Sequence, residues 1–107
     1  MANGKKCRVI LYAKTDWDTP EGLYLCGVTR TSGNWLPKDA CKMVPTEKGW
    51  RAIKYLTVGE PFEFKILRGR DWHHVEKGFW NEEIPNHNII PAKGLVVEMY
   101  IPTFRQD

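Results

Sequence analysis

The acidic residues and histidines of this chain could carry acid–base chemistry, but their spacing selects no catalytic pair. A glycosidase needs two carboxylates held at a defined separation. Glu82 and Glu83 are adjacent, as are His73 and His74, so each pair would point to opposite sides of an extended segment. Ser32, the only serine, lies in a turn-like stretch, and no His, Cys or Glu spacing matches a metal-ligand motif. We therefore expect no enzymatic activity, no cofactor and no metal site.

The tryptophans are the other residues whose type and placement indicate chemistry. Four of the five lie in or beside polar, loop-like segments, namely Trp17, Trp35, Trp72 and Trp80, whereas Trp50 begins an apolar run and is expected in the core. An indole ring in a loop offers a flat apolar face with a hydrogen-bonding edge. A sugar ring has apolar C–H faces and hydroxyls at its rim, so it suits such a platform. Each of these tryptophans could equally cover the core, but together they favour a sugar-binding platform.

Short runs of β-branched and aromatic residues, separated by turn residues, must position these side chains. The runs span residues 7–13, 22–28, 50–57, 61–67, 72–76 and 95–101. The clearest has Phe62, Phe64 and Ile66 alternating with Glu63 and Lys65, which is the two-residue period of a strand. Strands spaced in this way predict an all-β fold, an immunoglobulin-like antiparallel β-sandwich of about seven to eight strands. The whole chain, residues 1–107, is expected to form this single domain.

Charge and cysteine content narrow the functional classes further. The formal charge of +3 comes from Lys and Arg interspersed with Asp and Glu, which argues against nucleic acid as a partner. No apolar run approaches the roughly 20 residues needed to cross a bilayer, so no membrane partner is expected. The N-terminal residues show no signal-peptide pattern, so either a leader has been removed or the protein is intracellular; a cytoplasmic location is favoured. The odd set Cys7, Cys26 and Cys41 predicts free thiols, the first two buried, in a monomer.

Several motifs together resemble a known family. The chain contains YLCG at 24–27, GNWLP at 33–37, GEPFEFK at 59–65 and EIPNH at 83–87. Their order and spacing are similar to those of starch-binding domains, carbohydrate-binding module family 20, and of related early-set immunoglobulin-like domains. The resemblance extends over about residues 6–103. It implies an open β-sandwich that binds α-1,4-linked glucose chains such as starch, glycogen or malto-oligosaccharides.

The resemblance also implies site residues. Trp35 matches the first platform tryptophan of the family's main site. Glu63 and Lys65 match its polar partners, and Asn86 matches its asparagine after proline. By strand alternation, Glu63 and Lys65 share a face, which fits polar groups that reach a surface ligand.

Two tryptophans, Trp72 and Trp80, could supply the second platform ring of the main site. Trp80 is six residues before Asn86 and follows Phe79, so we expect Trp80 to be the partner of Trp35. Trp72 is then expected to pack inward from a strand. The family's second site uses tyrosines, for which Trp17 is the one plausible substitute.

These observations predict a non-catalytic α-glucan-binding module. A protein-interaction domain on the same sandwich is the first alternative, because a fold does not determine a function. A small barrel that binds single-stranded nucleic acid through stacked aromatics is the second. The sequence leaves open whether the module acts alone or belongs to a larger enzyme.

Overall fold

The computed structural model describes residues 4–105, which form ten strands in three sheets. Residues 1–3 and 106–107 of the predicted domain lie outside the described residues. The strands are β1 (Lys6–Lys14), β2 (Leu23–Gly27), β3 (Cys41–Lys42), β4 (Val44–Thr46), β5 (Gly49–Thr57), β6 (Phe62–Arg68), β7 (Glu76–Lys77), β8 (His87–Ile89), β9 (Val96–Tyr100) and β10 (Thr103–Phe104). Three single-turn 3-10 helices join them, η1 (Arg30–Ser32), η2 (Pro37–Asp39) and η3 (Trp72–His74). Within residues 4–105, no helix is long and apolar enough to cross a membrane.

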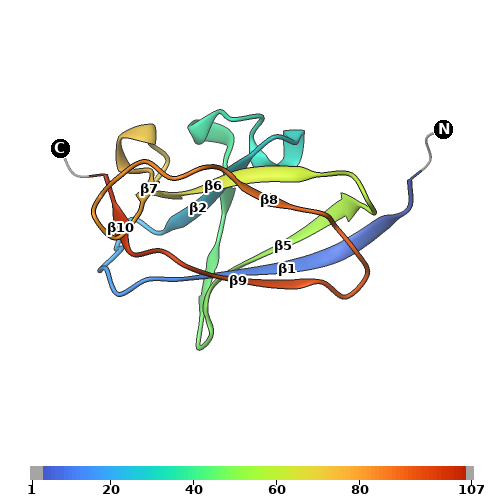
Figure 1. Cartoon of the computed structure of the whole chain (residues 1–107), viewed down its shortest axis with the longest axis horizontal. Helices are drawn as coiled ribbons and strands as arrows, with labels where there is room; N and C mark the ends of the chain where they lie inside the picture. The colour runs from blue at the N-terminus through green and yellow to red at the C-terminus, as the bar shows by residue number, and fades with distance from the viewer. Residues whose placement is uncertain (1–3, 106–107) are drawn as a thin grey trace.

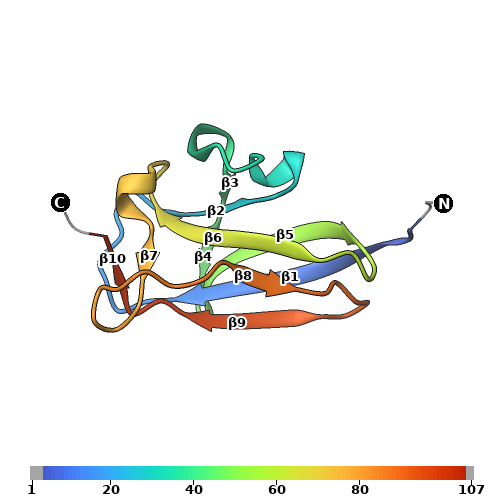
Figure 2. The ribbon, with the colours of Figure 1, turned by 45° about the horizontal axis from the view of Figure 1, so that its top comes forward.

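Two four-stranded sheets form the layers of the sandwich (Figure 1). One sheet has the order β4-β5-β1-β9 and the other the order β3-β2-β6-β8, while β10 and β7 pair at one end. The three 3-10 helices lie outside the second sheet, at the top of Figure 2. These 3-10 turns and the loops around them cover the outer face of the β3-β2-β6-β8 sheet.

Alternating side chains from both sheets fill the core. Val9 and Leu11 of β1 meet Phe62, Phe64 and Ile66 of β6 in one apolar cluster, and all five are almost completely buried. Burying such a side chain contributes about 1.5–3 kcal/mol. The alternation predicted for residues 62–66 is therefore confirmed. The face of β6 that carries Glu63 and Lys65 points away from this core and is the face on which a binding site can lie.

The predicted all-β sandwich is confirmed, with three differences in detail. Ten strands replace the expected seven to eight because five of them are only two or three residues long, too short to show a period. The pair β1–β9 is parallel, whereas the named pairs elsewhere are antiparallel. Residues 72–76, expected as one strand, form η3 and the start of β7.

The cysteines occupy apolar positions, as predicted for two of them. Cys7 and Cys26 are buried, and Cys41 is partly buried. Burial raises the pKa of the Cys26 thiol to about 11. Since the thiolate is the reactive form, Cys26 is inert at neutral pH.

A second, smaller apolar cluster lies on the outer face of the β3-β2-β6-β8 sheet. Tyr24 and Leu67 are register partners across β2 and β6, and both pack there with Cys26 and Ala40. These side chains point away from the main core because their neighbours in each strand point into it. Trp72 lies against this cluster, so the outer face carries a ring that is only partly buried.

Candidate functional site

A left-handed turn presents Trp35. Gly33, Asn34 and Trp35 have φ values of 93°, 49° and 63°, three consecutive residues in a region that only glycine adopts readily. The backbone N–H of Asn34 donates to Thr29 O at 2.9 Å, and that of Trp35 donates to Gly27 O at 2.9 Å. A bulky residue in this conformation costs of order 1–3 kcal/mol and persists where surrounding contacts hold it. The turn therefore fixes Trp35 at the end of β2.

Trp72 lies beside Trp35. Their ring centroids are 6.3 Å apart and their planes differ by 29°. The side chain of Asp71 caps η3 by accepting from the backbone N–H of His73 at 2.9 Å, which fixes the start of the turn that carries Trp72. We expected Trp80 to be the ring next to Trp35, but the ring in that position is Trp72. Trp72 was expected to point inward from a strand, and it lies instead in the 3-10 turn η3.

Glu63 and Asn86 meet next to the same end of β2. The amide nitrogen of Asn86 donates to Glu63 Oε1 at 3.3 Å, and both side chains are exposed. The carbonyl of Glu63 accepts from the N–H of Val28 at 3.0 Å, and Gly27, the preceding residue, holds the backbone of Trp35. The ring platform and this polar pair are thus attached to neighbouring residues of one strand end.

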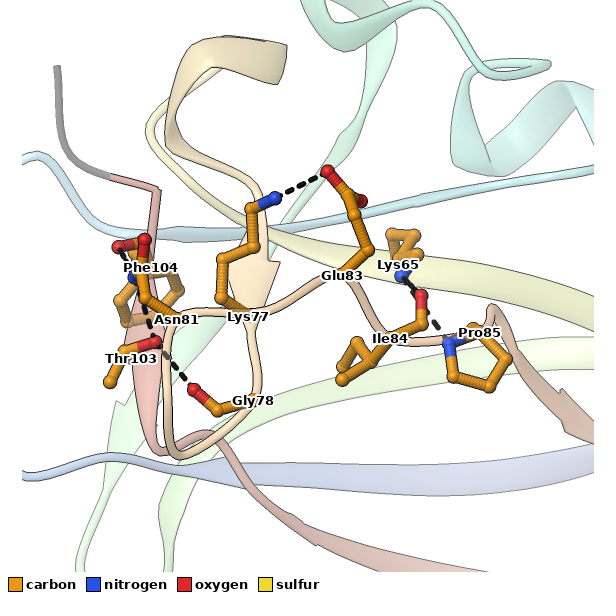
Figure 3. Close-up of polar contacts among 9 residues, drawn as sticks. All are labelled: Lys65, Lys77, Gly78, Asn81, Glu83, Ile84, Pro85, Thr103 and Phe104. Carbon is orange, nitrogen blue, oxygen red and sulfur yellow. Dashed lines mark hydrogen bonds and ion pairs between the residues drawn. The ribbon is translucent and has the colours of Figure 1, made fainter.

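Lys65 serves the site indirectly. Its side chain is only 7% exposed, and Nζ donates to the carbonyls of Ile84 and of Pro85, the latter at 3.3 Å (Figure 3). Burial lowers the pKa of Lys65, and the nearby carboxylates of Glu76 and Glu83 oppose that shift. We expected Lys65 to reach a ligand, but its ammonium is turned toward the backbone of the segment that leads into β8. Its role in this structure is to hold that segment.

A contact between Glu76 and His87, which the sequence reasoning missed, supports the same segment. Glu76 accepts from the backbone N–H of Ile66 at 2.6 Å and contacts His87 Nε2 at 2.8 Å. The His87 ring stacks on Phe64 with centroids 5.0 Å apart. Because His87 directly follows Asn86, the pair fixes the position of the asparagine. The sequence signal that could have indicated this contact is the histidine that directly follows Asn86 in the EIPNH motif.

Trp17 lies away from this platform. Its ring meets Phe104 edge-on at 5.6 Å and 69°, and the guanidinium of Arg68 lies 5.4 Å from its centroid. Trp17 packs against the main core. Trp17 is therefore engaged in packing, and its place in a second site stays a prediction.

Trp80 also lies elsewhere, in the connection between β7 and β8. It is exposed, as is the adjacent Phe79. Two pairs of predicted site residues are brought together, Trp35 with Trp72 and Glu63 with Asn86. Within residues 4–105 there is no group of three or more His, Cys, Asp or Glu residues that could hold a metal ion.

Comparison with known proteins identifies the family. The model of the starch binding domain, carbohydrate-binding module family 20, matches residues 6–98. The chain belongs to this family. No curated protein matches this starch-binding domain in sequence.

Solved structures share its fold. The starch-binding domain is similar to a family 20 module of a maltotetraose-forming amylase from Pseudomonas saccharophila, with a TM-score of 0.66, 20% identity, and coverage of 88% of this chain and 99% of that one. It is also similar to a family 15 glucoamylase from Hypocrea jecorina, with a TM-score of 0.72 and 19% identity over 98% of this chain. A γ-cyclodextrin glucanotransferase (gamma-CGTase) from Bacillus clarkii gives a TM-score of 0.66 and 24% identity over 96% of it. At such identities the similarity shows the fold alone. The chain spans 18% and 16% of the latter two proteins.

Proposed function

We infer that this starch-binding domain binds α-1,4-glucan chains, such as starch, glycogen or malto-oligosaccharides, and does not cleave them. The observation that carries the proposal is the pair of nearly parallel rings, Trp35 and Trp72, on the outer face of the sheet. Each ring is only partly buried, so each retains apolar surface for a ligand.

Polar groups beside the rings complete the proposed site. The carboxylate of Glu63 and the amide of Asn86 are exposed and hydrogen-bonded to each other. Together they offer an acceptor and a donor for sugar hydroxyls. Lys65 and the pair of Glu76 and His87 act one layer below, by positioning the backbone that carries Asn86.

Binding without cleavage follows from how the carboxylates are used. Hydrolysis of a glycosidic bond requires an acid and a second carboxylate on opposite sides of that bond. Glu76 is buried against a backbone N–H and His87, and Glu83 is paired with Lys77. These side chains support the fold. At the site, the exposed carboxylate of Glu63 is hydrogen-bonded to Asn86, and that of Asp71 caps the turn that carries Trp72.

A fluorescence titration with maltoheptaose tests the proposal. A shallow site with two stacked rings supplies about −5 to −6 kcal/mol, a dissociation constant of roughly 40–200 μM. Trp35→Ala is expected to weaken binding by at least about tenfold, with circular dichroism unchanged. Tyr55→Ala is the matched control, because Tyr55 is an exposed aromatic residue on the outer face of the other sheet and should not alter binding.

Two further arms separate the alternatives. Affinity for the neutral sugar should not depend on salt, whereas affinity for single-stranded nucleic acid would fall steeply with it. A β-linked cello-oligosaccharide of matched length should bind more weakly than maltoheptaose. Parental affinity in Trp35→Ala would show that the site is misassigned, and the absence of any tryptophan response would reject glucan binding.

A further inference from the structure

A lysine lies inside the sandwich, at a position that strand alternation assigns to an apolar side chain. Lys54 of β5 faces inward together with Ala52 and Leu56, and the three residues are 5%, 3% and 4% exposed. Burying an ammonium group costs free energy unless the group is paired and hydrogen-bonded. An apolar residue would satisfy the fold here at lower cost, so we expect this lysine to serve something other than the core.

The ammonium of Lys54 reaches the other layer of the sandwich. Its Nζ donates to the carbonyl of Thr31 in η1 at 2.7 Å. The strand that carries Lys54 belongs to the β4-β5-β1-β9 sheet, whereas η1 follows β2 and lies outside the opposite sheet (Figure 2). This hydrogen bond therefore joins one layer of the sandwich to a turn of the other.

The surroundings of Lys54 offer its charge little else. Among residues 4–105, no carboxylate forms an ion pair with this ammonium. Burial lowers the pKa of Lys54, and nearby Cys41 opposes that shift. The contact with the Thr31 carbonyl is thus the interaction that offsets part of the cost of burial.

An open pocket separates η1 from the end of β5. It has a volume of about 430 Å³ and is lined by residues 28–31 on one side and 55–57 on the other. Because side chains do not fill this space, apolar packing does not hold η1 against β5 there. The hydrogen bond from Lys54 makes the connection that packing leaves out.

The turn that accepts this bond is continuous with the turn that carries Trp35. The hydroxyls of Thr29 and Ser32 lie 2.8 Å apart, and Ser32 is completely buried. The backbone N–H of Asn34 donates to the carbonyl of Thr29 at 2.9 Å. Residues 29–35 therefore form one hydrogen-bonded unit, so a displacement of Thr31 would also displace the backbone of Trp35.

We propose that Lys54 is a positioning residue of the platform: by donating to Thr31, it holds the 29–35 unit where the Trp35 ring lies beside Trp72. This role rests on glucan binding being the function of the platform. Lys54 does not touch the sugar. It limits the conformational freedom of Trp35 that binding would otherwise have to remove.

Lys54→Met separates this role from a contribution to folding. Methionine keeps an unbranched apolar side chain but has no donor for the Thr31 carbonyl, and Thr31 is exposed, so water can replace the donor. Since a buried charge is removed, we expect the melting temperature to equal or exceed that of the parent. Affinity for maltoheptaose should nevertheless fall by about three- to tenfold, the cost of ordering one large side chain on binding.

The indole N–H signal of Trp35 in nuclear magnetic resonance gives a readout without sugar. Trp35→Phe assigns the signal by removing it. In Lys54→Met the signal is expected to shift or broaden, because the ring leaves its fixed position beside Trp72. A purely structural role in the core would change stability without this local response.

Two further variants serve as controls. Leu56→Met changes the next inward-facing residue of β5 at nearly constant volume, so the Trp35 signal and the affinity should stay parental. Lys54→Arg keeps a charged donor and should bind maltoheptaose more tightly than Lys54→Met does.

Each other outcome overturns one statement. A parent protein that does not respond to maltoheptaose would reject the function on which this role rests. Parental affinity in Lys54→Met, with the parent binding, would overturn the positioning role and leave the platform standing. A much lower melting temperature of Lys54→Met, or an equal loss of affinity in Leu56→Met, would make Lys54 a residue of the fold alone. A Lys54→Arg protein that folds but binds no better than Lys54→Met would reject the donor to Thr31 as the cause.

Discussion

Replacing Trp72 by alanine removes a ring that serves both the fold and the proposed site. Trp72 packs on the outer apolar cluster, where Tyr24, Cys26 and Leu67 are almost completely buried. Its ring also lies 6.3 Å from that of Trp35. The substitution therefore uncovers part of the outer sheet face and deprives Trp35 of its neighbour.

The size of both effects follows from these contacts. Truncating a fully buried Trp to Ala costs about 3–5 kcal/mol, so a partly exposed ring should cost about 2–3 kcal/mol. In a domain of this size that lowers the melting temperature by roughly 10–20 °C. Loss of one of two stacking rings should also weaken maltoheptaose binding by at least about tenfold.

Thermal melting by circular dichroism measures the first effect, and calorimetric titration far below the melting temperature measures the second. Trp72→Phe retains an apolar ring and should lose less of both. Trp80→Ala is the matched control for stability, since Trp80 is exposed, and its unfolding free energy should stay within about 0.5 kcal/mol of the parent. Parental melting of Trp72→Ala would refute the packing argument, and parental affinity would refute the two-ring platform.

Three further substitutions test the support of the site. Lys65→Met keeps the buried aliphatic part of the side chain but removes the donor to two backbone carbonyls. It should lower the free energy of unfolding in urea by about 1–3 kcal/mol and weaken maltoheptaose binding. Parental stability would mean that the two hydrogen bonds only offset the cost of burying the charge. Gly27→Ala would place a methyl group 2.8 Å from the carbonyl oxygen of Glu63, and we expect a loss of about 1–3 kcal/mol, which a parental melting curve would contradict. The hydrogen bond and charge of Lys77 lower the pKa of Glu83, so this contact stabilises the fold above the unfolded-state pKa and is lost as pH falls through the lowered folded-state value. Glu83→Gln should therefore melt below the parent at pH 7 and converge with it in acid, and a difference that persists at low pH would argue against the pair.

Local pattern determined much of the fold in advance. Alternation at Phe62, Phe64 and Ile66 identified the buried face of β6 because strand side chains have a period of two, whatever the rest of the chain does. Gly and Asn in the stretch before Trp35 indicated a turn, since both residues tolerate the left-handed region. The apolar, strand-like runs around Cys7 and Cys26 likewise predicted the burial of these two cysteines.

The composition of the site depended on contacts that no local pattern contains. Trp72 is 37 residues from Trp35 in the chain and reaches it only because β2 and β6 pair in the register that sets Tyr24 opposite Leu67. By spacing alone, Trp80 was the better candidate. The choice between the two rings was therefore made by sheet register and by the apolar cluster on which Trp72 packs.

Lys65 shows the same limit for a polar residue. Alternation correctly placed it on the face shared with Glu63, but could not say where its ammonium would find acceptors. Those acceptors are the carbonyls of Ile84 and Pro85, held alongside β6 by the pairing of β8 and the contact between Glu76 and His87. The pattern of the sequence was sufficient to predict the sandwich and the buried face of β6, while the glucan ligand stays a proposal. Only the tertiary structure decided which side chains meet, because strand register and loop packing bring together residues that are distant in the chain.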